Sequence, residues 1–149
     1  MDKTLEKYIN QDINNPRYLF HGSPKKLDVL KPMSAHDFNN NINNIDCAIY
    51  MFPSFVKTSA YAFKDTIKKN SNNLDWNFEI PSNNDYPVMK MRNVNIDDNI
   101  TGYIYVVKKT DEMKKDKNSI QYKCYKKLVP IDVIKVKYSD FKNYFEVIN

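Results

Sequence analysis

Polar and apolar residues alternate along several short stretches of the chain, which is the pattern of strands with one buried face. Five of these stretches lie in the second half: WNFEI (76–80), VMKMRNV (88–94), GYIYVV (102–107), IQYKCY (120–125) and VIKVKY (133–138). Two more strands are expected earlier, at RYLFH (17–21) and at the continuous apolar run CAIYMF (47–52). The pattern therefore predicts about seven strands.

Helices are expected over 3–14, from about 55 to 69, and over 139–145. Two of them have side chains at every fourth position along one face: Leu5, Ile9 and Ile13 in the first, and Phe55, Ser59, Phe63 and Ile67 in the second. Ser54 precedes the second helix and Ser139 is the first residue of the third, and serine is a favoured N-cap residue. Asn14-Asn15-Pro16 is expected to end the first helix.

The order of these elements indicates an α+β fold. Helices do not alternate regularly with strands, so a doubly wound parallel sheet is not expected, whereas mainly antiparallel pairing with peripheral helices fits the order. A chain of 149 residues is the size of one domain, with 1–16 as an N-terminal helix and linker. Polar loops are expected at 38–44, 70–75 and 108–117, and Gly102 is expected to permit a turn or bulge before its strand.

The positive net charge of the chain indicates which kinds of partner are favoured. The net charge is +5 with a pI near 9.0, which favours an anionic partner such as a nucleotide, a nucleic acid or an acidic protein surface. Nearly all of the basic residues are lysines, and Arg17 and Arg92 are the two arginines. Because base readout and bidentate phosphate binding depend on arginine, a sequence-specific nucleic-acid-binding protein is not favoured.

Cysteine usage and hydropathy indicate an intracellular, cytoplasmic protein. Cys47 and Cys124 are isolated, and are expected to be reduced. Cys47 opens an apolar strand, so it is expected in the core and not as a nucleophile. Residues 1–13 contain acidic side chains and no apolar core, which does not fit a signal peptide, and no apolar run approaches the ~20 residues of a membrane span. His21 and His36 lack metal-ligand spacing, so no metal is expected.

Two segments carry the candidate chemistry. His21-Gly22-Ser23 follows the apolar end of an early strand. Tyr50 lies in the apolar run that follows, with Thr58 eight and Tyr61 eleven residues further on, in the predicted helix. In order and spacing these residues resemble the ADP-ribosyltransferase superfamily, in the branch of diphtheria toxin and the poly(ADP-ribose) polymerases. The resemblance extends over residues 17–138.

The resemblance implies an ADP-ribosyltransferase-like split sheet and a role for each matched residue. The main chain of Gly22 would hold the carboxamide of NAD, since glycine permits close approach, and His21 would hydrogen-bond a ribose hydroxyl. The rings of Tyr50 and Tyr61 would enclose the nicotinamide, and Thr58 would bond to its amide, or Ser59 if the register is shifted by one. Ser23 completes the first motif. NAD would be the substrate; the acceptor is not indicated, and a protein is one candidate.

The third motif of this branch departs from the family pattern. A late strand there carries a glutamate, often followed by tyrosine, and the best match in this chain is Gln121-Tyr122. Glutamine can hydrogen-bond a hydroxyl but has no charge to stabilise the ribosyl cation. We expect nucleotide binding to survive this change better than transfer. Glu79, Glu112 and Asp116 are the carboxylates considered as substitutes.

Several alternatives remain open at this stage. His21 and Gln121 can be ordinary strand residues, and Tyr50 and Tyr61 ordinary core side chains. A catalytically inactive module of the same fold, binding a nucleotide or a protein, would also lack the glutamate. The related RNA 2′-phosphotransferase relies on several arginines, which this chain lacks. A basic RNA-binding domain would need aromatic side chains on an exposed sheet face. Oligomeric state is not indicated.

Overall fold

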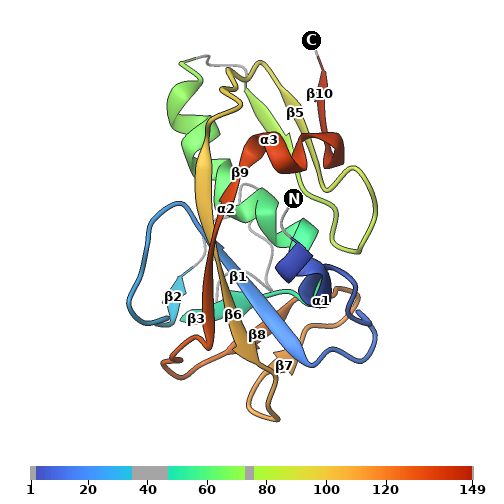
Figure 1. Ribbon diagram of the computed structural model, residues 1–149, viewed down its shortest axis with the longest axis vertical. Coiled ribbons are helices and arrows are strands. Elements are labelled where there is room, and N and C mark those ends of the chain that lie inside the picture. Colours follow the sequence, from blue (N-terminus) through green and yellow to red (C-terminus); the bar gives the residue numbers. More distant parts are fainter. Residues whose placement is uncertain (1–2, 35–46, 73–75, 149) are drawn as a thin grey trace.

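The computed structural model describes residues 3–34, 47–72 and 76–148 and has an α+β fold with mostly antiparallel strands and few helices (Figure 1). The helical segments are η1 (Lys3–Leu5), α1 (Glu6–Ile9), α2 (Phe55–Asn70), α3 (Tyr138–Phe141) and η3 (Lys142–Tyr144). The strands are β1 (Tyr18–Ser23), β2 (Met33–Ser34), β3 (Cys47–Met51), β4 (Asn77–Glu79), β5 (Met89–Arg92), β6 (Thr101–Lys108), β7 (Lys114–Lys115), β8 (Tyr122–Cys124), β9 (Asp132–Lys137) and β10 (Phe145–Ile148). The predicted loop at 38–44, together with His36, lies outside the described residues.

The strands form three sheets. The first has the order β1-β6-β9 and the second β2-β3-β8-β7, and all of their pairs are antiparallel. The third, β10-β5-β4, contains a parallel pair in which Phe145 lies opposite Met89. Figure 1 shows β1, β6 and β9 running through the middle of the molecule, with β3, β8 and β7 at its lower end and β5 and β10 at its upper end.

The first two sheets meet at a single backbone bridge between β1 and β3. Phe20 N–H donates to Phe52 O at 2.8 Å, and Phe52 N–H donates to Phe20 O at 2.9 Å. No further bridge between these two strands is present among the described residues. The two sheets therefore separate where β1 and β3 diverge. The predicted α+β class with mainly antiparallel pairing is confirmed.

Helix α2 packs directly on β1 and β6 because both strands present a glycine to it. A Cβ on Gly22 would lie 2.6 Å from Thr58 O, and a Cβ on Gly102 would lie 2.5 Å from Ala62 O. Gly102 is thus part of β6 and allows close helix packing, so the predicted turn or bulge before the strand is wrong. Ser54 caps the helix as predicted, since its Oγ accepts from Lys57 N–H at 3.1 Å.

Two apolar clusters lie on opposite sides of β1 and β6. The larger one joins α2 to the third sheet and the C-terminal helix, through buried residues that include Phe20, Phe55, Phe63, Met89 and Phe141. The smaller one fills the space between the first two sheets, and its buried residues include Leu19, Ile49, Met51, Tyr105 and Tyr122. Cys124 belongs to this cluster, whereas Cys47 is exposed, contrary to the expectation that it lies in the core; both thiols are free.

The first helix is shorter than the predicted range 3–14. The helix stops at Ile9, and Gln11 then uses its amide on the main chain of two other segments. Its Oε1 accepts from Tyr18 N–H at 3.1 Å, and its Nε2 donates to Tyr18 O and Pro53 O at 2.9 and 2.6 Å. These bonds hold the linker against β1 and the start of α2.

Two other boundaries differ from the sequence prediction. The last helix begins at Tyr138 without a side-chain cap and gives way at Phe145 to β10, so Ser139 is not its cap. The charged segment 108–117 is not only loop, because Lys114–Lys115 forms β7 and pairs with β8. In both cases a short strand is stabilised by pairing: β10 pairs with the distant β5, and β7 pairs with the nearby β8. The hydrophobic periodicity of the sequence reveals neither pairing.

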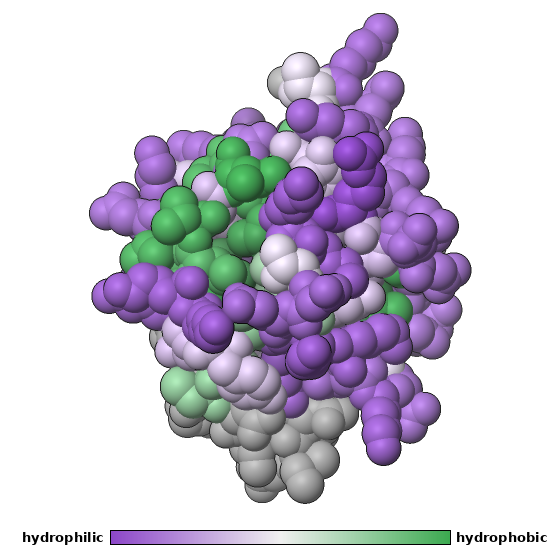
Figure 2. All heavy atoms as spheres, turned by 90° about the horizontal axis from the view of Figure 1, so that it is seen from below, coloured by the Kyte–Doolittle hydropathy of each residue, from purple (hydrophilic) through white to green (hydrophobic). Residues whose placement is uncertain are grey.

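The surface at the lower end is mostly hydrophilic and has one contiguous apolar area (Figure 2). Among the described residues, three large exposed apolar side chains lie on the connection into β9 or at its start, a segment that Figure 1 places at that end: Val129, Ile131 and Val133.

Candidate functional site

The candidate site lies at the point where β1 and β3 diverge. His21 follows the Phe20–Phe52 bridge, and its Nδ1 lies 2.8 Å from Tyr50 O. A carbonyl oxygen only accepts hydrogen bonds, so Nδ1 carries the hydrogen and Nε2 keeps its lone pair. Burial lowers the pKa of His21, which favours the neutral ring. His21 therefore presents an acceptor, and a ligand hydroxyl would donate to it.

The structure brings His21 to the main chain of Tyr50 and not to its ring. Side chains alternate between the faces of a strand, and Phe20 and Phe52 point to the same face because they are bridge partners. Tyr50 shares the face of Phe52, whereas His21 shares the opposite face with Tyr105, at 6.3 Å between ring centroids. The two residues therefore approach the strand divergence from opposite sides.

Gly22 directs its main chain toward the gap between β1 and β3. In an antiparallel strand, N–H and C=O groups of alternate residues point to the same neighbour. Phe20 is bonded to β3, so Gly22, two residues on, points its N–H and C=O to that side as well. Beyond the bridge β1 and β3 separate, and Gly22 thus offers a donor and an acceptor along one edge.

An aromatic pair lies beside Gly22. Tyr61 on α2 is the nearest side chain to the glycine, since a Cβ on Gly22 would lie 3.1 Å from Tyr61 Cβ. The Tyr61 ring stacks on Phe52, with centroids 4.7 Å apart and an interplanar angle of 15°. Tyr50 lies two residues before Phe52 on the same strand face, and both tyrosines are partly exposed. The sequence had identified the two tyrosines but not Phe52.

The hydroxyl groups of the two motifs are already used within the protein. Thr58 is fully buried, and its Oγ1 donates to Ser54 O at 2.7 Å. Ser59, the alternative in a shifted register, is equally buried and donates to Val56 O at 2.5 Å. Ser23 is buried, and its Oγ accepts from Lys25 N–H at 3.2 Å, which shapes the turn after β1. Each hydroxyl therefore has a local structural partner, and contact of any of them with a ligand remains a prediction.

Gln121 lies next to a carboxylate. Its main-chain oxygen accepts from Asp116 N–H at 2.8 Å, and its Nε2 donates to Asp116 Oδ2 at 2.6 Å. Lys123, on the same strand face, lies 3.4 Å from Asp116 Oδ1 and places its Nζ 5.8 Å from the centre of the Tyr50 ring. Gln121 and Lys123 are buried, with 8% and 5% of their surface exposed. This cluster connects Gln121 to Tyr50 through Asp116 and Lys123.

The other two carboxylates that the sequence suggested lie elsewhere. Glu112 forms an exposed ion pair with Lys126, at 3.0 Å between Oε1 and Nζ. Glu79 is in β4, opposite Lys90 in the third sheet. Of the three residues, Asp116 alone contacts Gln121 among the described interactions. The sequence feature that could have located Asp116 is the turn at Lys117-Asn118, which joins β7 to β8. Asn118 has a φ of 58°, a conformation that asparagine tolerates.

Sequence reasoning missed Lys57, the residue before Thr58. It is 1% exposed, and its Nζ donates to Asn83 O at 3.2 Å and lies 5.1 Å from the centre of the Phe52 ring. Desolvation lowers the pKa of Lys57 to about 8, partly offset by the charge of Asp85. The neighbouring Asn84 has a buried Oδ1 with no hydrogen-bond partner. The sequence does not reveal this burial, because a lysine within a helix is ordinarily expected to be exposed to solvent.

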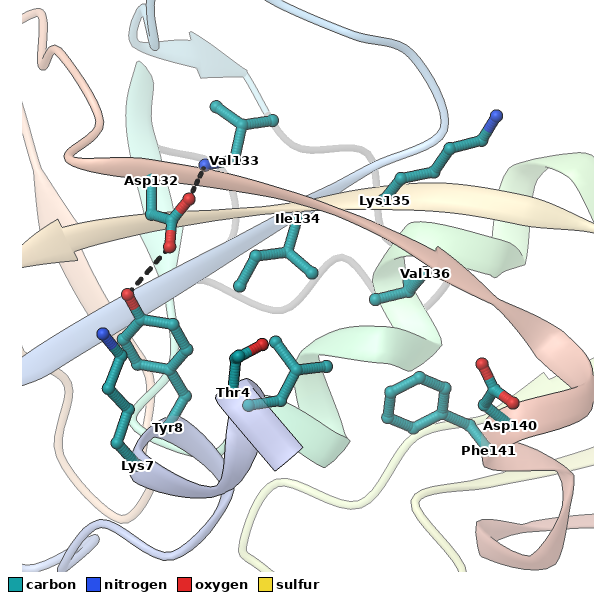
Figure 3. Close-up of a pocket in the computed structure, with 11 residues that line it drawn as sticks. Thr4, Lys7, Tyr8, Asp132, Val133, Ile134, Lys135, Val136, Asp140 and Phe141 are labelled. Atoms are coloured by element: carbon teal, nitrogen blue, oxygen red, sulfur yellow. Dashed lines mark hydrogen bonds between the residues drawn. The ribbon is translucent and has the colours of Figure 1, made fainter. Parts of the chain in front are cut away.

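The described cavities do not coincide with this site. One, of about 400 Å³, lies between the N-terminal helix, β9 and α3, and Figure 3 shows Tyr8 and Asp132 at one end of it and Asp140 and Phe141 at the other. A second, of about 370 Å³, lies between the end of α2 and residues 93–95. The residues around Gly22 line neither of these two cavities.

Comparison of the chain with known protein families, with curated proteins and with solved structures gives no match in any of the three. Within the described part of the chain, no helix has the length and apolar character to cross a membrane, and no three histidine, cysteine or acidic side chains gather as potential metal ligands. The assignment of function therefore depends on the local geometry of the site.

Proposed function

We propose that this chain is an ADP-ribosyltransferase-like domain that binds NAD where β1 and β3 diverge. The observation that carries the proposal is the main-chain edge of Gly22, which follows His21 on β1 and lies next to Tyr61 on α2. A carboxamide presents an N–H donor beside its carbonyl acceptor, and the C=O and N–H of Gly22 would match these two groups. The order of the motifs and the direction of the Gly22 main chain support the same ligand.

The surrounding groups suit the rest of a dinucleotide. The neutral His21 Nε2 would accept a hydrogen bond from a ribose hydroxyl. The ring of Tyr61 would stack on the nicotinamide, where offset stacking is worth roughly 0.5–1.5 kcal/mol. Lysine side chains at Lys57 and Lys123 would favour the negative pyrophosphate at this end of the molecule. We regard Tyr50 as the second ring of the nicotinamide site.

The reaction that this arrangement would favour is cleavage of the bond between ribose C1′ and nicotinamide. The bonding electron pair goes to the nicotinamide nitrogen, which becomes neutral, and C1′ develops positive charge. Water or a nucleophilic side chain of an acceptor protein then forms the new bond to C1′ and releases a proton. Because position 121 is a glutamine, we propose weak transfer to a single acceptor group, with an inactive nucleotide-binding or partner-binding module as the alternative.

Thermal unfolding with NAD and with nicotinamide tests the binding proposal. A ligand at one hundred times its Kd stabilises a protein by about 2.7 kcal/mol, which is roughly 5–10 °C in Tm for a domain of this size. We expect this shift in the wild type and in Thr101→Ala, a control on β6 that pairs with Lys137 and lies beyond the residues paired with β1, and no shift in His21→Ala. A wild type that neither ligand stabilises would contradict the proposal, and equal shifts in all three proteins would exclude His21 from the site.

A further inference from the structure

We propose that Asp116 supplies the negative charge that position 121 lacks, and that it binds the ribose of NAD directly as the catalytic carboxylate of this site. The inference rests on the proposed function and deepens it by naming the residue that stabilises the cation. The family pattern assigns no role to this position. The inference arises from the hairpin contact between Asp116 and Gln121.

The hairpin places the carboxylate beside the glutamine by strand register. Lys114 and Lys115 of β7 lie opposite Lys123 and Tyr122 of β8, and the Asp116 N–H···O=C Gln121 bond of 2.8 Å continues that ladder by one residue. Directly opposed residues of an antiparallel pair point to the same face. Asp116 therefore occupies the same face as Gln121 and Lys123, which is the face of Tyr50 on the next strand.

Asp116 is oriented by a hydrogen bond from Gln121 and an ion pair with Lys123, and it retains capacity for a further donor. Its Oδ2 accepts from Gln121 Nε2 at 2.6 Å, and its Oδ1 lies 3.4 Å from Lys123 Nζ, with 10% of the side chain exposed. An ionised carboxylate has about four lone-pair sites, and these two contacts use two of them. A ribose hydroxyl can therefore donate to Asp116 without displacing either partner.

The charge has a defined role in the step. As the bond from C1′ to nicotinamide breaks, positive charge develops on the ribose, and a carboxylate bonded to a ribose hydroxyl lowers the energy of that state more than the ground state. Lys123 offsets part of the field because its ammonium is close to the same carboxylate. We therefore expect slow turnover in the wild type that depends on Asp116.

The test is NAD hydrolysis, followed by release of nicotinamide, in a set of hairpin variants. We expect Asp116→Asn to lower kcat at least tenfold while nicotinamide still raises Tm. The double variant Asp116→Asn with Gln121→Glu exchanges the two side-chain groups across the same hydrogen bond, keeps an acceptor for Lys123, and should restore kcat. Glu112→Gln, which alters an exposed ion pair between the residues before β7 and those after β8, is the control and should equal the wild type.

The outcomes separate this inference from the proposed function. A wild type that binds NAD without hydrolysing it, or an Asp116→Asn variant with unchanged kcat, overturns the role of Asp116 and leaves nucleotide binding in place. If Asp116→Asn does not fold, Asp116→Glu, which keeps the charge, and Asp116→Ser, which removes it, take its place: a folded Asp116→Ser variant with the kcat of the wild type overturns the role of Asp116. If NAD and nicotinamide stabilise none of these proteins, the proposed function fails and this inference fails with it.

Discussion

The rings of Phe52 and Tyr61 stack with their centroids 4.7 Å apart, and this contact joins the end of β3 to the middle of α2. Phe52 is buried, and it also forms the backbone bridge to Phe20. One face of the Tyr61 ring is thus covered by the protein itself. A ligand beside Gly22 would stack on the other face, on a ring that is already held in position.

Replacing Tyr61 by leucine should weaken binding of nicotinamide roughly 2- to 12-fold, the equivalent of 0.5–1.5 kcal/mol of ring stacking. The measurement is the Kd from thermal or calorimetric titration. Phe78→Leu on β4, which removes a ring that contacts Trp76 outside the site, is the control and should leave the Kd unchanged. If the two variants bind equally well, Tyr61 does not contact the nicotinamide.

Lys57 should make the protein more stable as the pH rises above 8. Its pKa in the folded state is about 8 and its ordinary value is 10.5, so between these values the unfolded chain binds more protons, and the free energy of unfolding increases with pH. The gain from pH 8 to about 9.5 should be on the order of 2 kcal/mol relative to Lys57→Met.

Urea unfolding at several pH values measures this difference. Lys64→Met, on the same helix, is the matched control and should follow the wild type. If the wild type and Lys57→Met have parallel pH profiles, the ammonium of Lys57 is not desolvated as described. Above pH 10 the tyrosines also titrate, so the comparison is made below that pH.

The Tyr8 hydroxyl donates to Asp132 Oδ2 at 2.9 Å and joins the N-terminal helix to β9 (Figure 3). Tyr8→Phe removes a hydrogen bond to a charged acceptor and should lower the free energy of unfolding at pH 7 by about 1.5–3 kcal/mol. Burial and Asp132 raise the pKa of Tyr8 to about 12. The contribution is therefore complete below pH 10 and is lost as the pH rises through 12.

Chemical denaturation of Tyr8→Phe at pH 7 checks the loss. Tyr18→Phe keeps the ring that packs edge-on against Tyr8 and is the control, with an expected change of less than 0.5 kcal/mol. A Tyr8→Phe variant as stable as the wild type would show that the hydroxyl contact contributes nothing.

Gly102→Ala should destabilise the protein by about 1–3 kcal/mol, since the new Cβ would lie 2.5 Å from Ala62 O and a helix backbone has little room to move. Gly22→Ala meets Thr58 O at 2.6 Å and should cost a similar amount. The two variants should differ in their response to the ligand. Nicotinamide should still raise the Tm of folded Gly102→Ala, and it should not raise the Tm of folded Gly22→Ala. A Gly22→Ala protein with a normal shift would exclude the Gly22 main chain from the site.

Local pattern was sufficient for much of the fold. The strands at 18–23, 101–108 and 132–137 and the helix after Ser54 follow from alternation, periodicity and a capping residue, all of which act between residues close in sequence. The same is true of the α+β class. The order of the motifs at His21, Tyr50 and Tyr61 also identified the strands and the helix that meet at the candidate site.

Tertiary structure decided the features that depend on contacts between distant residues. The packing of Gly102 against α2, the burial of Lys57 under Asn83 and the parallel pairing of Phe145 with Met89 have no local signal, because each partner lies many positions away. The contact of Asp116 with Gln121 depends on a hairpin in a segment whose charges resemble a solvated loop. The sequence by itself determined most of the elements and the uncharged glutamine at position 121, and the fold alone placed a carboxylate beside it.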